Sequence, residues 1–456
     1  MRIAVVNGSP SGLAGISAHY VKYLEKRFPE HQFRVHEVAR QIHALERDER
    51  RFSGVAEDLA AAELVLWAFP VYFMLVSAQL KRFIELLFER GQASLLAGKV
   101  TSSLSTSAHH YDHTAHDYMQ GICCDLGMIY VRGFSAGAND LLGEDGRNNL
   151  LGWAKELFRH AAGELPTEIR WPPIAWSPSR YDPSLPAPVA KTSSKRIAVI
   201  SDAGPEDQNL ERMIEVFERA VYAPVDRIEL RELRMAGGCL GCMTCFDDGK
   251  CRYQDDYAAA FDQRVRPADV VIYAGAVRDR FLSARMKTFI DRYFSNGHRP
   301  VVAGKLVGFL VSGPLQQLPT LRECIEAHIE VGRCQRLGVV TDEQAFPEQT
   351  TARLQSMARA AERWLAAPWY TPPTFRGFAA AKNFRDLVYA NKGIMSADHR
   401  FYRAHGLYDY PQQDRGRRLF NALLLLGKRF PSVRAQIGKK MGEKHVEAHR
   451  RLLERL

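Results

Sequence analysis

The chain has 456 residues, and its hydrophobic fraction of 46% and charged fraction of 25% are ordinary for a globular protein of two or three domains. The net charge of +10 is concentrated in residues 412–456, which carry twelve Lys or Arg and four Asp or Glu, so overall charge does not argue for nucleic acid or membrane binding. No leader pattern, no apolar run near the roughly 20 residues that span a bilayer and no secreted disulfide pattern is visible, so we expect a cytoplasmic protein.

Short apolar segments alternate with helical patterns in the first part of the chain. This alternation is typical of a doubly wound parallel sheet and predicts an α/β domain over residues 1–165. The expected strands are residues 2–6, 33–36, 64–68, 100–105 and 128–133. Four helices are expected: one that ends near residue 27, one over residues 77–89, and two that begin near residues 114 and 148.

The same pattern then starts again after a proline-rich segment. Seven prolines fall between residues 166 and 188, which predicts a linker over residues 166–194. Residues 196–200 (RIAVI) repeat residues 2–6 (RIAVV), and SARMK at residues 283–287 repeats SAQLK at residues 77–81. This internal duplication predicts a second domain of the same fold over residues 195–367. Residues 368–456 are expected to form a basic, mainly helical extension.

Four of the eight cysteines lie in one short loop of the second copy, with spacing C-x2-C-x2-C-x5-C. Thiolates this close in sequence can converge on one inorganic centre, and the neighbouring glycines permit tight turns. The spacing predicts an iron–sulfur or zinc site, and a loop that binds nothing is the alternative. The candidate ligands are Cys239, Cys242, Cys245 and Cys251.

The loop between Gly8 and Ser17 has the composition of a phosphate site. It contains small residues and hydroxyls, no carboxylate, and leads into a helix whose N-terminal amides favour an anion. A plain tight turn is the alternative. Loops after the third and fourth predicted strands should reach the same crevice with aromatic and hydroxyl side chains, as a flavin mononucleotide (FMN) requires. The candidate FMN residues are Ser9, Pro10, Ser11, Ile16, Ser17, Pro70, Val71, Tyr72, Phe73, Thr106, Ser107, Tyr111 and His113.

The loop after the fourth strand is also rich in histidine. His109, His110, Asp112, His113 and His116 have the side chains of a metal site, but their place beside the predicted flavin favours ring contact or proton supply. We predict Tyr111 or His113 as the catalytic group near the ring. A solvated loop histidine is the alternative.

These motifs resemble a known superfamily. Residues 1–160 resemble the NADPH-dependent FMN reductases and flavodoxin-like oxidoreductases in the G-S-P loop, the P-V-Y-F turn and the S-A-Q-L-K helix. Residues 195–366 are similar to the iron–sulfur flavoproteins, in which such a cysteine loop, followed by an acidic pair (here Asp255 and Asp256), carries a [4Fe–4S] cluster. The resemblance implies FMN, a cluster on the four cysteines, and NAD(P)H as reductant.

The two copies depart from this pattern in complementary ways. The second phosphate loop contains three carboxylates, Asp202, Glu206 and Asp207, which would repel a phosphate, and Arg278 replaces Tyr72. The first copy has no cysteines where the second has its loop. We therefore hypothesise one FMN in the first copy, one cluster in the second, and an intramolecular pseudo-dimer that brings them together.

The C-terminal tail groups basic residues around Leu423–Leu426. A helix packed on its own domains or on a second chain is the favoured interpretation; an anionic membrane surface or an acidic redox partner is less favoured. Nucleic acid is the least supported, because no binding motif accompanies the charge. The basic residues are Arg417, Arg418, Lys428, Arg429, Lys439 and Lys440.

Taken together, the sequence predicts an FMN-dependent NAD(P)H oxidoreductase. Electrons would pass from the nicotinamide cofactor through FMN, and through a [4Fe–4S] cluster, to a quinone-like molecule or a redox protein. A homo-oligomer is compatible with the sequence. The alternatives are a non-catalytic flavin and iron–sulfur electron carrier or redox sensor, and a zinc-stabilised binding module.

Overall fold

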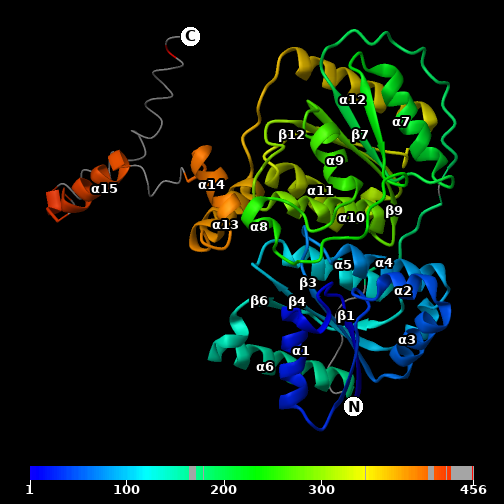
Figure 1. The fold of residues 1–456 in the computed structure, drawn as a ribbon, viewed down its shortest axis with the longest axis vertical. Coiled ribbons are helices and arrows are strands. Elements are labelled where there is room, and N and C mark those ends of the chain that lie inside the picture. Colours follow the sequence, from blue (N-terminus) through cyan, green and yellow to red (C-terminus); the bar gives the residue numbers. More distant parts are fainter. Residues whose placement is uncertain are drawn as a thin grey trace. The chain divides into compact units, whose positions relative to one another are not determined.

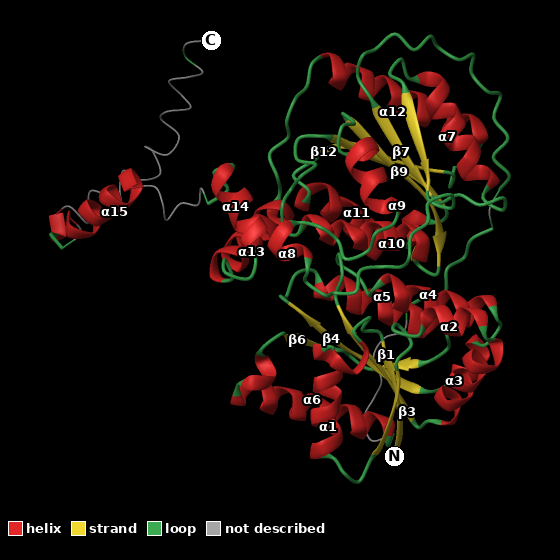
Figure 2. Cartoon of the chain, viewed as in Figure 1, coloured by secondary structure: helices red, strands yellow, loops and turns green. Residues whose placement is uncertain are grey.

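A computed structural model describes residues 1–163, 171–177, 179–344, 346–408, 415–427, 429–432 and 454. The chain forms two compact units, a large unit of residues 1–398 and a C-terminal unit of residues 399–456. The large unit contains two six-stranded sheets, each with helices on both faces (Figures 1 and 2). The predicted tandem α/β fold is confirmed. Part of the proline-rich segment, residues 164–170 and 178, lies outside the described residues.

The first sheet has the order β2-β1-β3-β4-β5, with all neighbours parallel, and β6 pairs with β4. The register pairs Pro70 with Thr106, so the loops that follow β3 and β4 leave the sheet at the same edge. The strands are β1 (Arg2–Asn7), β2 (Gln32–His36), β3 (Leu64–Pro70), β4 (Val100–Ser107), β5 (Ile129–Tyr130) and β6 (Phe134–Gly137). The helices are α1 (Ile16–Arg27), α2 (Ile42–Arg47), α3 (Glu49–Ala61), α4 (Ala78–Glu89), α5 (Asp112–Asp125) and α6 (Glu144–Ala161).

Two details differ from the sequence prediction. The strand expected over residues 128–133 is limited to β5 (129–130), and β6 follows at 134–137; between them the Ser102 hydroxyl donates to the backbone oxygens of Val131 and Arg132 at 2.8 and 3.2 Å. The Val131 amide still donates to the Thr101 backbone oxygen at 2.8 Å. Helices α2 and α3 fill the connection between β2 and β3, for which no element was predicted.

The second sheet repeats the topology of the first, with the order β8-β7-β9-β11-β12, and β10 pairs antiparallel with β9. Its strands are β7 (Ile197–Ser201), β8 (Val225–Glu229), β9 (Val270–Arg278), β10 (Phe281–Leu282), β11 (Leu306–Ser312) and β12 (Gln335–Thr341). Its helices are α7 (Gln208–Ala220), α8 (Cys245–Asp248), α9 (Asp256–Ala260), α10 (Ala284–Arg292), α11 (Pro319–Val331) and α12 (Pro347–Ala366). Helix α13 (Phe375–Ala390) follows and packs on α11.

The first and second domains contact each other through the duplicated helices α4 and α10. The contacts are reciprocal. Asp291 accepts a hydrogen bond from the Ala78 amide at 2.8 Å, and Glu85 accepts one from the Ala284 amide at 2.6 Å, at the matching position of the other helix. Lys81 donates to the backbone oxygen of Arg278 at 2.9 Å. Its counterpart Lys287 donates to that of Tyr72 at 2.8 Å, as an intramolecular pseudo-dimer requires.

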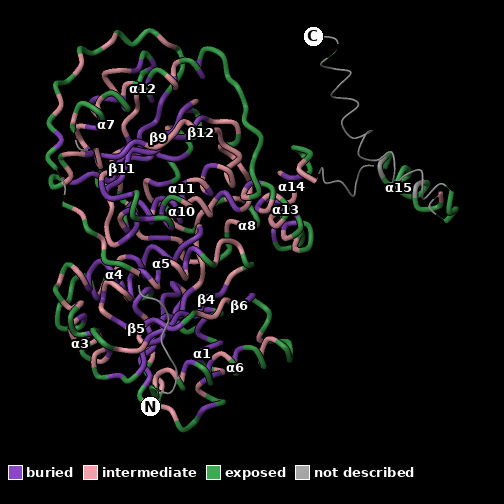
Figure 3. Tube along the Cα trace, turned by 180° about the vertical axis from the view of Figure 1, so that it is seen from behind, coloured by how far each residue is buried: buried purple, intermediate pink, exposed green. Residues whose placement is uncertain are grey.

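The hydrophobic core follows this arrangement. One cluster contains buried residues of both halves, including Leu80 and Phe83 of α4 and Met286 and Phe289 of α10. Two further clusters lie under the outer helices, α1 and α6 on the first sheet and α7 and α12 on the second. The inner strands β1, β3, β7, β9 and β11 are mostly buried, whereas the edge strands β2, β8 and β12 are partly exposed, and much of the exposed surface lies on the outer helices and loops (Figure 3). The two halves therefore share one continuous apolar interior.

The C-terminal unit is described in part. Helix α14 (Ser396–Ala404) spans the boundary between the units, and α15 (Arg415–Gly427) lies in the C-terminal unit, which confirms a helical extension. On α15 the side chains of Leu419, Phe420 and Leu423 are exposed. Of the basic tail residues, Arg418 and Arg429 are exposed, whereas Lys428, Lys439, Lys440 and the side chain of Arg417 lie outside the described residues. Among the helices that the structure describes, none combines the length and apolar character needed to cross a bilayer.

Candidate functional site

The loop between β1 and α1 forms a cradle of small residues. Ser9 is buried and its amide donates to Asn7 Oδ1 at 3.0 Å, and a Cβ on Gly15 would lie 2.2 Å from Ser9 Oγ. The Ser17 hydroxyl is buried without a hydrogen-bond partner among the described residues. No described side chain caps the N-terminus of α1. Since the first amides of a helix have no acceptor within the helix, this loop can hold an anion such as a phosphate group.

One neighbour of this loop was not predicted. Glu37, from the connection after β2, accepts a hydrogen bond from the Leu13 amide at 2.9 Å. Arg40 lies 3.5 Å from the same carboxylate and offsets its charge. The loop itself carries no carboxylate, as expected, but the fold places one against its outer end.

The loops after β3 and β4 are fixed to each other at their base. The Val71 amide donates to the Thr106 backbone oxygen at 3.0 Å, and Tyr72 and Leu75 exchange two backbone hydrogen bonds. Phe73 and Met74 follow with φ of 41° and 68°, in the left-handed region that is costly for residues other than glycine. This strained turn aims Phe73 at the second half, where its ring lies 4.6 Å from that of Phe294.

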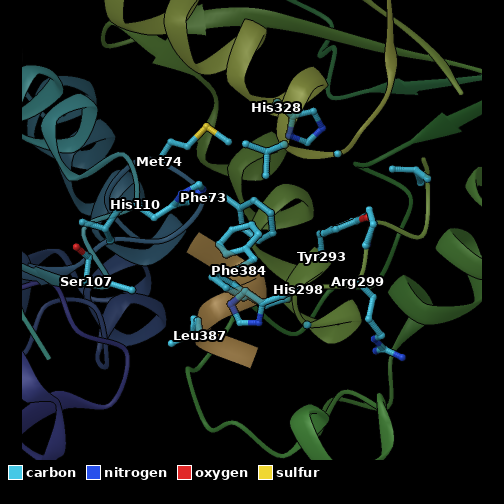
Figure 4. A pocket seen from close by; sticks show the side chains of 18 residues that line it. Phe73, Met74, Ser107, His110, Tyr293, His298, Arg299, His328, Phe384 and Leu387 are labelled. Carbon is cyan, nitrogen blue, oxygen red and sulfur yellow. The ribbon is translucent and has the colours of Figure 1, made fainter. Parts of the chain in front are cut away.

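These loops border an apolar cavity of about 230 Å³ (Figure 4). The first half contributes Phe73 and His110, the second half Phe294 and His298, and α13 contributes Phe384. His110 lies 4.5 Å from Phe384 between ring centroids, and His298 lies 4.8 Å from Phe384, so the three rings pack around one wall. The cavity is therefore assembled by three parts of the chain that are far apart in sequence. The remaining lining residues are Val71, Met74, Ser107, Ala108, Tyr293, Gly297, Arg299, Pro300, Val302, His328, Val331, Gly332 and Leu387.

The predicted catalytic pair lies beside this cavity but does not line it. Tyr111, with φ of 55°, precedes α5; burial raises its pKa, with a further increase from Glu323 on α11. His113 is exposed at the start of α5. The histidine of this loop that enters the cavity is His110. Burial lowers the pKa of its side chain to about 4, so His110 is neutral near pH 7. The assignment of Tyr111 and His113 stays a prediction.

The ring of His116 lies between two serine hydroxyls of β4. Its Nδ1 lies 2.7 Å from Ser103 Oγ and its Nε2 lies 2.8 Å from Ser105 Oγ, and burial lowers its pKa to about 4. A neutral imidazole can donate to one hydroxyl and accept from the other. Across the described residues, no group of three or more His, Cys, Asp or Glu side chains has the arrangement of a metal site, and this includes the histidine-rich loop.

The cysteine loop of the second half lies on the candidate FMN loops of the first half. Ser11 donates to the Leu240 backbone oxygen at 3.2 Å, and Gln79 donates to that of Cys239 at 3.3 Å. A Cβ on Gly241 would lie 2.2 Å from the Tyr72 hydroxyl, so only glycine permits this approach. Tyr72 is thus covered by the cysteine loop, while its neighbour Phe73 enters the cavity.

The four thiols are close enough to influence one another but differ in environment. Burial raises the pKa of Cys239 to about 12 and that of Cys245 to about 11, and in both cases neighbouring cysteines add to the increase. Burial acts in the same direction on Cys242, but hydrogen bonds from Thr244 and the backbone, together with the charge of Arg252, lower its pKa on balance. All eight cysteines, which lie within the described residues, are free. In kind and proximity the donor set fits a metal cluster, although the sulfur atoms do not converge as ligands.

The second phosphate loop is occupied by ion pairs. Arg278, at the position of Tyr72, pairs with Asp207 at 2.5 Å, and Arg231 pairs with Glu206 at 2.9 Å. A Cβ on Gly204 would meet the Arg231 guanidinium at 2.3 Å, so the arginine fills the space beside the loop. Burial raises the pKa of Asp202 to about 6. The three carboxylates and Arg278 at the position of Tyr72 were noted in the sequence, whereas the pairing of Arg278 with Asp207 and of Arg231 with Glu206 was not predicted.

Comparison with known proteins identifies the family. The family model for NADPH-dependent FMN reductase matches residues 1–140 and again residues 196–325. The chain belongs to this family. It is a tandem member, since the first matched segment contains all strands of the first sheet and the second contains all strands of the second sheet except β12.

The comparisons also found individual similar proteins. The iron-sulfur flavoprotein of Archaeoglobus fulgidus is 29% identical over 175 residues, which are 37% of this chain and 78% of the relative. A crystal structure of an NADH:FMN oxidoreductase (EMOB) in its apo form has 19% identity and a TM-score of 0.31, covering 37% of this chain and 91% of that one. An FMN-dependent NADH-azoreductase of Bacillus anthracis in complex with FMN has 13% identity and a TM-score of 0.27, and the match covers 36% of this chain and 97% of that one.

Several residues of the candidate site escaped sequence reasoning. Phe294 and His298 follow α10, and the duplication offered a signal for them, because the reciprocal α4–α10 contact must bring the end of α10 to the first half. Phe384 and Leu387 lie on α13, outside both family matches, and have no counterpart in the first copy. No sequence signal tied them to the cavity.

Proposed function

We propose that this tandem FMN reductase family member is an NAD(P)H oxidoreductase with one FMN site, in the first half, and a [4Fe–4S] cluster on the cysteine loop of the second half. The observation that carries the proposal is the contact between the two candidate sites. The Ser11 hydroxyl of the phosphate loop donates to the cysteine loop at Leu240, and Gly241 lies against the Tyr72 hydroxyl. Two groups held there would be neighbours although their ligands come from different halves.

The FMN site is proposed from groups that fit the cofactor. The amides at the start of α1 and the unpartnered Ser17 hydroxyl would hold its phosphate, and Ser9 would complete the cradle. Pro70–Phe73, Thr106 and Ser107 would flank the ring. The bound FMN supplies hydride chemistry, and a cluster on Cys239, Cys242, Cys245 and Cys251 would supply one-electron storage.

The chain's own contribution is a mostly apolar cavity beside these loops. Phe73, Phe294 and Phe384 exclude water and offer ring faces to a planar molecule. The neutral His110 adds hydrogen-bonding capacity without a net charge. We propose that the electron acceptor is a small planar molecule that enters here. We also propose the domain limits 1–165 and 195–367, with the linker and extension as expected from the sequence.

An anaerobic visible spectrum with FMN, iron and sulfide measured per chain tests the proposal. One FMN, four irons and four sulfides per chain are expected. Replacing Cys239 with Ser should remove iron and leave FMN in place, and Cys334→Ser, outside the loop, is the matched control. Two FMN per chain without iron would overturn the proposal, and bound zinc with no colour would favour a structural cysteine site. Steady-state oxidation of NAD(P)H with a small quinone then separates an enzyme from a carrier, which would show no turnover.

A further inference from the structure

The positive charge of the chain and its exposed apolar side chains fall in one segment, residues 369–456, called the basic segment below. It carries eighteen Lys or Arg and seven Asp or Glu, so it accounts for the whole net charge of +10, and residues 1–368 are close to neutral. It also holds twelve of the twenty large hydrophobic side chains that are exposed among the described residues. The basic segment lies beyond both stretches that match the FMN reductase family, so the family assignment does not explain it.

Helix α13 presents part of this apolar surface on one side. Phe375, Phe378 and Tyr389 are spaced by whole turns of the helix, so they share one side of it, and all three are exposed. The exposed fractions of Phe375 and Phe378 are 84% and 61%. Lys382 is exposed on the same side, and the ammonium of Lys392, just after the helix, lies 5.2 Å from the centre of the Tyr389 ring. The outer side of α13 therefore combines exposed aromatic rings with lysines.

The opposite side of α13 faces the large unit. Gly377 and Val388 are buried there, and Phe384 and Leu387 line the candidate cavity (Figure 4). The orientation of the helix is therefore fixed by packing, and its aromatic side is left exposed. Because an α-helix with its side chains is about 10–12 Å across, a surface bound to the outer side of α13 would lie about one helix diameter from the cavity.

Helix α15, in the C-terminal unit, has the same character. Leu419, Leu423 and Leu426 follow the spacing i, i+4 and i+7, so they form one apolar stripe, and all three are exposed. Arg415 and Arg418, in the first turn of the helix, are exposed as well. A helix with apolar side chains on one side and basic residues beside them is typical of segments that lie in the plane of a membrane interface.

We propose that the outer side of α13 binds the surface of an anionic lipid bilayer, and that the rest of the basic segment adds to the attraction. The aromatic side chains would enter the boundary between headgroups and acyl chains, and the basic residues would face the anionic headgroups. Charge favours lipid over a second copy of this chain, because two basic segments repel each other, whereas anionic headgroups neutralise them. The proposal depends on neither FMN nor a cluster.

Flotation of the full chain with lipid vesicles tests the proposal. Vesicles of phosphatidylglycerol and phosphatidylcholine in equal parts should bind the protein at least about tenfold more tightly than phosphatidylcholine alone. Combining Phe375→Ser with Phe378→Ser should weaken binding to the anionic vesicles about tenfold or more, because less apolar surface enters the lipid. The matched control is Leu142→Ser, at a leucine of the first half that is 79% exposed, and it should bind as the wild type does. Equal binding by the wild type and the double variant overturns the proposal, as does equal binding to both kinds of vesicle.

Two further measurements separate entry into lipid from other uses of this surface. A tryptophan introduced by Phe378→Trp should lose fluorescence with anionic vesicles whose acyl chains carry bromine, whereas one introduced by Leu142→Trp should not. Equal quenching of the two variants would show that α13 stays out of the lipid and would overturn the proposal. Sedimentation velocity without lipid should give the same mass for the wild type and the Phe375 and Phe378 double variant. A wild-type dimer that the double variant breaks up would assign the surface to a second copy of the chain instead.

Discussion

At the scale of single residues, buried histidines couple stability to pH. Burial lowers the pKa values of His110, His116 and His328 to about 4, well below the ordinary value near 6.5. Between these values the unfolded chain binds protons that the folded chain does not, so stability is lost as pH falls. Each histidine contributes a slope of about 1.4 kcal/mol per pH unit.

We therefore expect the free energy of unfolding to decrease as pH falls from about 6.5 toward 4, and denaturant titrations across this range measure it. His116→Gln keeps a group that can bridge Ser103 and Ser105 but does not titrate. Its slope should be shallower than that of the wild type by about 1.4 kcal/mol per pH unit. Equal slopes would show that His116 is not buried as a neutral ring.

Ser17 gives a second prediction at this scale. Its hydroxyl is buried and has no partner within the described part of the chain, which costs stability unless a ligand satisfies it. Ser17→Ala should weaken FMN binding by about 10- to 100-fold, the value of one hydrogen bond to a charged group, as measured by fluorescence titration of the apoprotein. Without FMN, its free energy of unfolding should be unchanged or higher. Ser94→Ala, at an exposed position, should affect neither.

At the scale of elements, the α4–α10 contact is held by buried charges. Lys81, Lys287 and Asp291 are fully buried, and Glu85 nearly so, with each Lys paired to the acid four residues later. Burial raises the pKa of Asp291 to about 6 and lowers the pKa of Lys287, so the environment weakens both charges. Such a pair adds little net stability, but removal of one partner leaves a buried charge uncompensated.

Asp291→Ala should therefore lower the free energy of unfolding by about 3–5 kcal/mol in urea titrations, because the buried Lys287 loses its carboxylate partner, keeping only the Tyr72 backbone oxygen, and the Ala78 amide loses its acceptor. Glu85→Ala, its counterpart, should cost a similar amount. Glu326→Ala breaks the exposed pair with Arg336 and should cost at most about 1 kcal/mol. Losses of the same small size in all three variants would contradict a buried reciprocal interface.

At the scale of the whole molecule, most of what could be predicted about the fold came from the internal repeat. Two copies of one βα pattern predicted two sheets, and the matching SAQLK and SARMK segments became the paired helices α4 and α10. The contact of Glu37 with the first phosphate loop and the ion pairs of Arg231 and Arg278 at the second could not be predicted, because they are long-range contacts that local sequence spacing does not indicate. His110 was singled out only as one of several loop histidines, since which of them enters the cavity depends on α13.

The shared core leads to a prediction about the large unit as a whole. Buried residues of both halves belong to one hydrophobic cluster, and the α4–α10 interface crosses its middle. Neither half can open without exposing apolar surface of the other, so residues 1–398 should unfold in one cooperative transition. Hydrogen exchange followed by mass spectrometry measures this, with peptides from β3 and β11 reporting on the two sheets. FMN at 100 times its dissociation constant should add about 2.7 kcal/mol of protection in both sheets, although its proposed site lies in the first. Protection confined to β3, or separate transitions for the two sheets, would show that the halves fold independently.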